Sequence, residues 1–187
     1  MAIAAQGLGT PRPSRPAGRA SLCKVLDRIG TIQLDAVNVL SRTQYLVCFS
    51  RIGGFDRSTM EALSQPGGPW FEYWGHAASL LPVELHPLFR WKMERWRDDQ
   101  VDSPQVQARR RVWREAHQDY LQRVLDEITD RGPLAASQLS EPRRRAGEWW
   151  GRRSDGRRAL ELLFGDGVLA AWRSSTFERV YDLTDRV

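Results

Sequence analysis

Apolar residues recur at helical spacing along most of the chain. Between Ser21 and Gly30 they fall at positions i, i+3, i+4 and i+7, which predicts an amphipathic helix that ends at the glycine (Leu22, Val25, Leu26, Ile29). Similar stripes predict further helices over residues 40–52, 58–63, 87–97, 112–131 and 157–164. The chain is therefore expected to be mainly helical.

Short extended segments interrupt this helical pattern. Residues 70–74 and 77–81 flank the dipeptide Gly75-His76, and this arrangement predicts a hairpin. Residues 168–172 and 177–183 flank a polar turn and predict a second hairpin. A short strand is expected at residues 32–35, after the first amphipathic helix, and a short helical element over 134–139.

Helices followed by a hairpin occur twice, which is the order of a winged helix. The predicted fold class is mainly α with small β-wings, an α+β chain of tandem winged-helix domains. The expected boundaries are a first winged helix over 1–97, a polar linker over 98–111 and a second winged helix over 112–187.

Length and composition limit the class of protein. A chain of 187 residues can bury one good core or two small ones, and it has no apolar stretch of the roughly 20 residues that span a bilayer. No signal peptide is visible, so a cytoplasmic location and no membrane partner are expected. Cys23 and Cys48 are isolated among apolar neighbours and are expected to be small buried hydrophobes. The three histidines have no partner at ligand spacing, so neither metal nor cofactor is assigned.

The net charge of +5 is concentrated in one segment. Residues 143–158 hold seven arginines against two acids, and the rest of the chain is balanced. A second basic patch lies at Arg12, Arg15 and Arg19. Clustered arginine is typical of proteins that bind a polyanion, although a solvated loop would have the same composition.

The short strand carries the residues with the clearest chemistry. Alternation places Gln33 and Asp35 on one side of a strand and Leu34 on the other. An amide and a carboxylate side by side could position a water and take up positive charge, as hydrolysis of a glycosidic bond requires. The alternative is an ordinary polar strand edge.

Several segments together resemble the AlkZ/YcaQ family of bacterial DNA glycosylases, which unhook interstrand crosslinks and remove alkylated bases. The order and spacing of the segments are more specific than any one of them. They are Ala4-Ala5-Gln6-Gly7-Leu8, residues 32–42, residues 71–79, Trp149-Trp150, residues 157–164 and residues 177–183.

The resemblance implies a fold, a site and a substrate. The family has its catalytic motif in the first winged helix, and Gln33-Leu34-Asp35 matches the Gln-Φ-Asp form of the YcaQ-like subgroup. That subgroup acts on N7-alkylguanine monoadducts as well as crosslinks. The expected activity is therefore that of a monofunctional DNA glycosylase, a DNA-repair hydrolase, acting as a monomer on double-stranded DNA with alkylated or crosslinked guanine. It would work at the bacterial nucleoid. The family's third winged helix and C-terminal barrel are expected to be absent from this chain.

Other residues are assigned supporting roles. Asn38 and Arg42 follow the motif by one helical turn and could support Asp35. His76 is either a histidine that stabilises the hairpin or part of the catalytic pocket. Phosphate contacts are expected from Arg143, Arg144, Arg145, Arg152 and Arg153, and next from Arg12 and Arg15. Arg157 and Arg158 open a helix and could be structural.

Two other functions are also compatible with the sequence. A winged-helix transcription regulator would bind DNA without chemistry, and its DNA affinity would not depend on Asp35. The chain could also be an inert, shortened relative of the enzymes.

Overall fold

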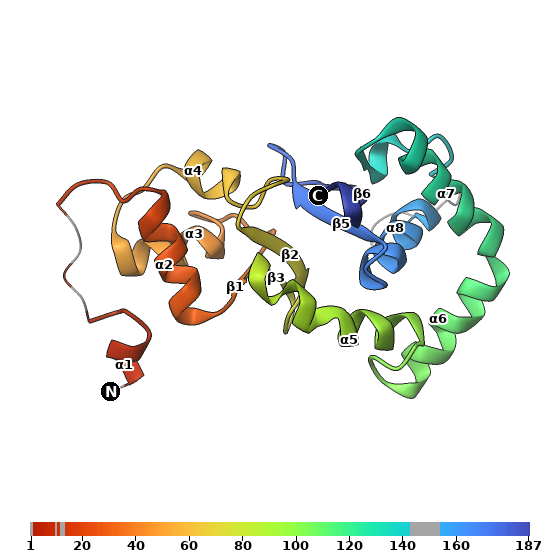
Figure 1. Cartoon of the computed structure of the whole chain (residues 1–187), viewed down its shortest axis with the longest axis horizontal. Coiled ribbons are helices and arrows are strands. Elements are labelled where there is room, and N and C mark those ends of the chain that lie inside the picture. The colour runs from red at the N-terminus through yellow and green to blue at the C-terminus, as the bar shows by residue number, and fades with distance from the viewer. Residues whose placement is uncertain (1, 10, 12–13, 143–153) are drawn as a thin grey trace. The chain divides into compact units, whose positions relative to one another are not determined.

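The computed structural model describes residues 2–9, 11, 14–142 and 154–187. The chain divides into two compact units, one ending at His86 and the other beginning at Pro87 (Figure 1). Each unit combines helices with a three-stranded antiparallel sheet. The prediction of a mainly α chain with small β-wings is confirmed.

The first unit begins with helices and ends in a hairpin. Its strands pair in the order β1-β3-β2, so the short β1 is added to the edge of the predicted hairpin. The elements are α1 (Ala2–Ala5), α2 (Arg19–Ile29), β1 (Ile32–Gln33), α3 (Thr43–Ile52), α4 (Arg57–Ala62), β2 (Trp70–Trp74), β3 (Ala78–Pro82) and the 3₁₀ helix Val83–Leu85.

The core of this unit lies between α2, α3, α4 and the sheet. Leu22 and Leu26 from the predicted stripe of α2 are completely buried, and they meet Ile32 from β1. Cys48 of α3 is also completely buried, as predicted, whereas Cys23 is only half-buried. Because burial disfavours the charged thiolate, the pKa of Cys48 is raised to about 11.

The second unit repeats this arrangement with other elements. Its strands pair in the order β4-β6-β5. The elements are α5 (His86–Arg97), α6 (Pro104–Ala116), α7 (Gln118–Arg131), β4 (Leu134–Ala135), the 3₁₀ helix Ala136–Gln138, α8 (Asp155–Gly165), β5 (Leu169–Arg173), β6 (Arg179–Leu183) and the 3₁₀ helix Thr184–Arg186.

The prediction of a short helical element over residues 134–139 is only partly right. Leu134 and Ala135 pair with Tyr181 and Val180 of β6, and only Ala136–Gln138 is helical, as a single 3₁₀ turn. Leu134 is buried and pairs with the edge of the sheet, and this pairing favours an extended backbone over a helical one.

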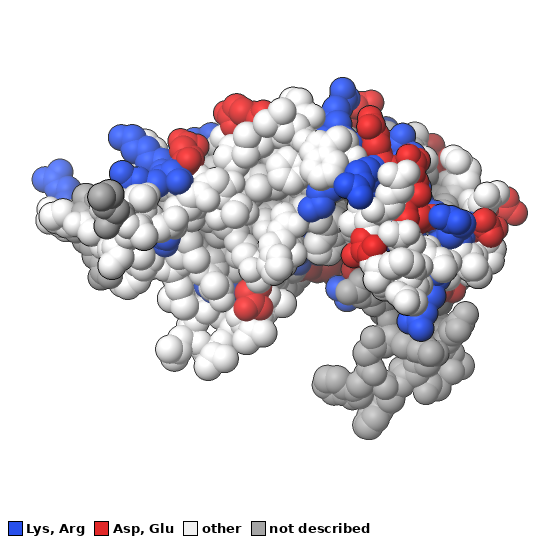
Figure 2. Space-filling view, turned by 90° about the horizontal axis from the view of Figure 1, so that it is seen from below, with Lys and Arg blue, Asp and Glu red and all other residues white. Residues whose placement is uncertain are grey.

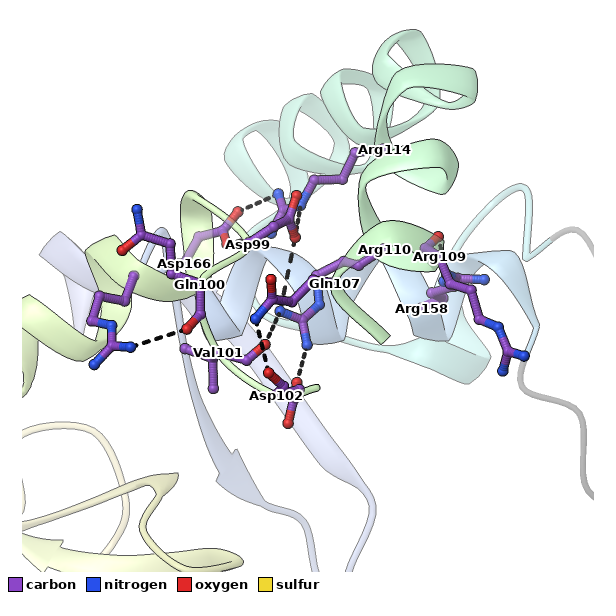
Figure 3. Close-up of polar contacts among 11 residues, drawn as sticks. Asp99, Gln100, Val101, Asp102, Gln107, Arg109, Arg110, Arg114, Arg158 and Asp166 are labelled. Atoms are coloured by element: carbon purple, nitrogen blue, oxygen red, sulfur yellow. Dashed lines mark hydrogen bonds and ion pairs between the residues drawn. The ribbon is translucent and has the colours of Figure 1, made fainter. Parts of the chain in front are cut away.

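A cluster of buried charges fixes the turn between α5 and α6 (Figure 3). Arg114 donates to both oxygens of Asp166, at 2.7 and 2.6 Å, and its Nε lies 3.7 Å from Asp99 Oδ1. Arg110 pairs with Asp102 and covers the Trp96 ring at 4.2 Å. Removing one partner of such a network would leave a buried charge uncompensated, at a cost of roughly 3–5 kcal/mol.

Asp99, Asp102 and Arg110 of this cluster belong to residues 98–111, the segment predicted as a linker. Residues 98–103 form the turn that the cluster fixes, and α6 begins at Pro104, so residues 98–111 include the first part of a helix. The division into compact units falls between His86 and Pro87, after the first residue of α5. Among the described helices, none is both long enough and apolar enough to cross a membrane.

Candidate active site

The two residues of the motif lie at the end of β1. Ile32 pairs with Leu80 and Gln33 with Ser79 of β3, and the Leu34 N–H donates to the Ala78 carbonyl at 2.7 Å. The strand ends at Gln33, so the prediction of a strand that carries both polar residues is wrong for Asp35. The chain leaves the sheet there because Asp35 bonds to α3 rather than to β3.

Three hydrogen bonds hold Asp35 in the loop that follows. Its Oδ1 accepts from the Val37 N–H at 2.9 Å, and its Oδ2 accepts from the Thr43 hydroxyl at 3.4 Å. Its own N–H donates to Gln44 Oε1 at 3.2 Å. The half-buried carboxylate is thus fixed at the first turn of α3, where the helix N–H groups favour a negative charge.

The carboxylate keeps capacity for another donor. An ionised carboxyl has about four lone-pair sites, and two of them are used by Val37 and Thr43. Gln33 is exposed, and within the described part of the chain its side-chain amide makes no hydrogen bond. A water could therefore be bound by either group or by both.

Gln44 is the residue of this site that sequence reasoning missed. It is only 2% exposed, although it is polar and lies in the first turn of α3. Gln44 is nine residues from Asp35 in the sequence. This separation matches neither the period of a helix nor that of a strand, so the sequence does not indicate that the two residues are in contact. Only the return of the chain over α3 brings the two together.

The remaining predicted site residues of this unit lie around the same loop. Asn38 is exposed in the loop, and Arg42 is the half-buried N-cap residue of α3, which has no side-chain cap bond. His76 is exposed in the tight turn between β2 and β3, two residues from the Ala78 carbonyl that binds Leu34. Among the described residues, neither Asn38 nor His76 bonds to the Asp35 carboxylate.

The loop after Asp35 also exposes apolar side chains. Val39 is 86% exposed and Leu40 is 93% exposed, and Val37 is 62% exposed. No charged residue lies between Asp35 and Arg42. The carboxylate is therefore followed by an uncharged, apolar loop.

The structure tests few of the predicted phosphate contacts. Arg15 is exposed, whereas Arg12, Arg143, Arg144, Arg145, Arg152 and Arg153 lie outside the described residues. Arg158 has a structural role: it covers the Trp113 ring at 4.8 Å and donates to the Arg109 carbonyl. Arg157 pairs with Glu161 one turn along α8. In Figure 2, Lys and Arg side chains form separate groups with Asp and Glu among them.

No site for a metal ion is found among the described residues. They include no group of three or more His, Cys, Asp and Glu side chains that could hold one.

Comparison with known families matches this chain to one model over most of its length. Residues 26–187 match the model of the AlkZ-like DNA glycosylases, so the chain belongs to the DNA glycosylase AlkZ-like family. Members of this class are hydrolases that act on N-glycosyl bonds of DNA in repair. No solved structure matches the chain.

Proposed function

We propose that this protein is a DNA glycosylase that hydrolyses the N-glycosidic bond of N7-alkylguanine and unhooks interstrand crosslinks. The observation that carries the proposal is the Asp35 carboxylate, held by Val37 and Thr43 directly after Gln33. Membership in the AlkZ-like family supports the class of reaction.

The leaving group explains why two residues suffice. Guanine alkylated at N7 carries a positive charge and departs as a neutral base without protonation, so the general acid of most glycoside hydrolysis is not needed. What remains is to stabilise an oxocarbenium-like sugar and to direct a water at its anomeric carbon.

Asp35 could perform both remaining tasks. Its negative charge opposes the positive charge that develops on the sugar as the bond to the base breaks. As water adds to the anomeric carbon, the carboxylate takes the proton that the water loses. The Gln33 amide, which can donate and accept, would hold that water.

We also interpret both units as winged helices. In the first, α2, β1, α3, α4, β2 and β3 follow one another, and the edge strand β1 pairs with β3. In the second, α7, β4, α8, β5 and β6 repeat the same strand order. Arg15, together with the arginines at 12, 143–145, 152 and 153, would supply phosphate contacts, which give affinity that falls steeply with salt.

The test is single-turnover release of N7-methylguanine from duplex DNA. Asp35→Asn keeps an oxygen that can accept from Val37 but removes the charge, and we expect the rate to fall by about 10²–10³. Asp27→Asn is the matched control, because Asp27 is an exposed carboxylate on α2 of the same unit. A rate for Asp35→Asn within a few-fold of wild type would exclude the role. DNA binding without release from either protein would favour a regulator or an inactive relative.

A further inference from the structure

Positively charged side chains line a cavity at the end of α3 that is farther from Asp35. It has a volume of about 180 Å³, and its lining includes Lys24 and Arg28 of α2 and Arg51 of α3. The other lining residues are Gly7, Pro11, Ser21, Val25 and Ile52, so no acid lines the cavity in the described part of the chain. Figure 2 shows a group of Lys and Arg side chains on the unit that contains α1 and α2, with an acidic side chain beside it.

None of the three cations forms an ion pair with a described residue, although the exposed Asp27 lies on the same helix as Lys24 and Arg28. Arg51 donates to the carbonyls of Gln6 and Val47 at 2.8 Å and to the Ser50 hydroxyl at 3.2 Å, all of which are neutral. Within the described residues, Lys24 and Arg28 make no ion pair. Three positive charges around one cavity repel one another, and this repulsion is relieved when an anion binds.

Gly7 and Pro11, which precede α2, line part of the cavity. Arg51 holds this segment through the Gln6 carbonyl, and the Arg28 guanidinium lies against Gly7. A Cβ at Gly7 would come within 3.0 Å of Arg28 Nη1, and Gly7 has a φ of +76°, so glycine suits this approach. The match to the family model begins at residue 26, after this segment.

We propose that this cavity binds a phosphate group. Arginine and lysine are the side chains that proteins use for phosphate, and the Ser21 hydroxyl adds a neutral donor. The phosphate comes from the backbone of duplex DNA or from a small free anion, and the same residues would recognise either. Binding of a phosphate in this cavity does not depend on the proposed glycosylase activity. The position of that phosphate relative to the target sugar does rest on it, because the loop that begins at Asp35 is then the catalytic loop.

The length of α3 relates the cavity to the catalytic loop. Thr43, which binds Asp35, and Arg51 are eight residues apart on α3. At a rise of ~1.5 Å per residue they are separated by about 12 Å along the helix. A DNA strand advances ~3.4 Å along the duplex axis per nucleotide, so a backbone phosphate in the cavity would lie no more than about four nucleotides from the target sugar.

Two measurements test the proposal. Inorganic phosphate is titrated at constant ionic strength while the amide resonances of Gly7, Ser21 and Lys24 are followed. The affinity of the protein is then measured for duplex DNA that contains one abasic analogue at a fixed position. In each duplex a single phosphate is replaced by an uncharged methylphosphonate. Both are repeated on Lys24→Gln/Arg28→Gln and on the charge-matched control Arg111→Gln/Arg123→Gln, whose side chains lie exposed on α6 and α7.

For a backbone phosphate, one methylphosphonate within about four nucleotides of the analogue should weaken binding to wild type by about tenfold. The same replacement should not weaken binding to Lys24→Gln/Arg28→Gln any further. Amide shifts with inorganic phosphate that the variant loses, without any such position in DNA, would identify a free anion as the ligand.

Absence of both signals in wild type would overturn the proposal. Lys24→Gln alone serves as a second variant, because Lys24 is exposed and its replacement leaves the contacts of Arg28 with Gly7 in place. Failure of base release by the wild-type protein would contradict the proposed function but would leave the amide shifts with inorganic phosphate unchanged.

Discussion

The side chain of Gln44 accepts a hydrogen bond from the main-chain N–H of Asp35, at 3.2 Å. Since Gln44 is 2% exposed, this bond ties the candidate catalytic residue to a buried position of α3. Thr43, its neighbour, binds the Asp35 carboxylate itself. The first turn of α3 therefore fixes both the backbone and the side chain of Asp35.

Replacing Gln44 by methionine should impair catalysis without removing any reacting group. The variant keeps the volume but loses the acceptor for the Asp35 N–H, which costs about 1 kcal/mol of stability and lets the carboxylate move. We expect single-turnover base release to fall by roughly tenfold while duplex affinity is retained. Gln105→Met on the exposed surface of α6 is the control. Equal rates for the two variants would contradict a positioning role.

The exposed loop leucine should matter for DNA and not for folding. Leu40 is 93% exposed, so Leu40→Ser should change the free energy of unfolding by less than about 0.5 kcal/mol. If the loop enters a groove and packs against base edges, the same change should weaken duplex binding by about tenfold. Leu88→Ser, at a position 65% exposed on α5, controls for the loss of an apolar surface residue. Binding equal to wild type would mean that the loop stays outside the duplex.

Gly165 is required by the packing of the second unit. A Cβ at this position of α8 would lie 2.0 Å from Nε1 of Trp96 on α5. Gly165→Ala should therefore destabilise the protein by about 1–3 kcal/mol, because the indole cannot move without disturbing Arg110 above it. Urea unfolding measures the loss. Gly54→Ala has open space around the new methyl group and should be close to neutral.

Stability at alkaline pH should depend on Tyr45. Its hydroxyl donates to Glu61 Oε1 at 2.5 Å, and burial together with this carboxylate raises the pKa of Tyr45 to about 12. In the unfolded chain the pKa is about 10, so the folded state holds the proton more tightly. This contribution is fully present below about pH 10 and is lost as the pH rises through about 12.

The variant Tyr45→Phe isolates this effect. It should be less stable than wild type by about 1 kcal/mol at pH 8, and the difference should shrink as the pH approaches 12. Unfolding by urea at several pH values measures both quantities. A difference that stays constant up to pH 12 would show that Tyr45 does not titrate with folding. Glu61→Gln keeps an acceptor for the Tyr45 hydroxyl but removes the charge. It should reduce the dependence of the unfolding free energy on pH between about 10 and 12 only in part.

The local sequence pattern determined most of the helices and both hairpins. The stripe of Leu22, Val25 and Leu26 is the buried face of α2, and Gly75-His76 is the turn of the first hairpin. These features depend on neighbours within a few residues, so spacing alone reveals them. The motif Gln33-Leu34-Asp35 and the family to which the chain belongs could also be identified from the sequence.

Tertiary structure decided what depends on distant segments. The strands β1 and β4 are two residues long and exist because each pairs with the edge of a hairpin formed later in the chain. Asp35 lies outside the strand, and its N–H donates to Gln44 of α3 instead of to the sheet. The cavity beside Lys24 and Arg51 joins residues from separate helices. Spacing along the chain carries no information on such contacts, because burial and hydrogen bonding select them only when the whole unit folds.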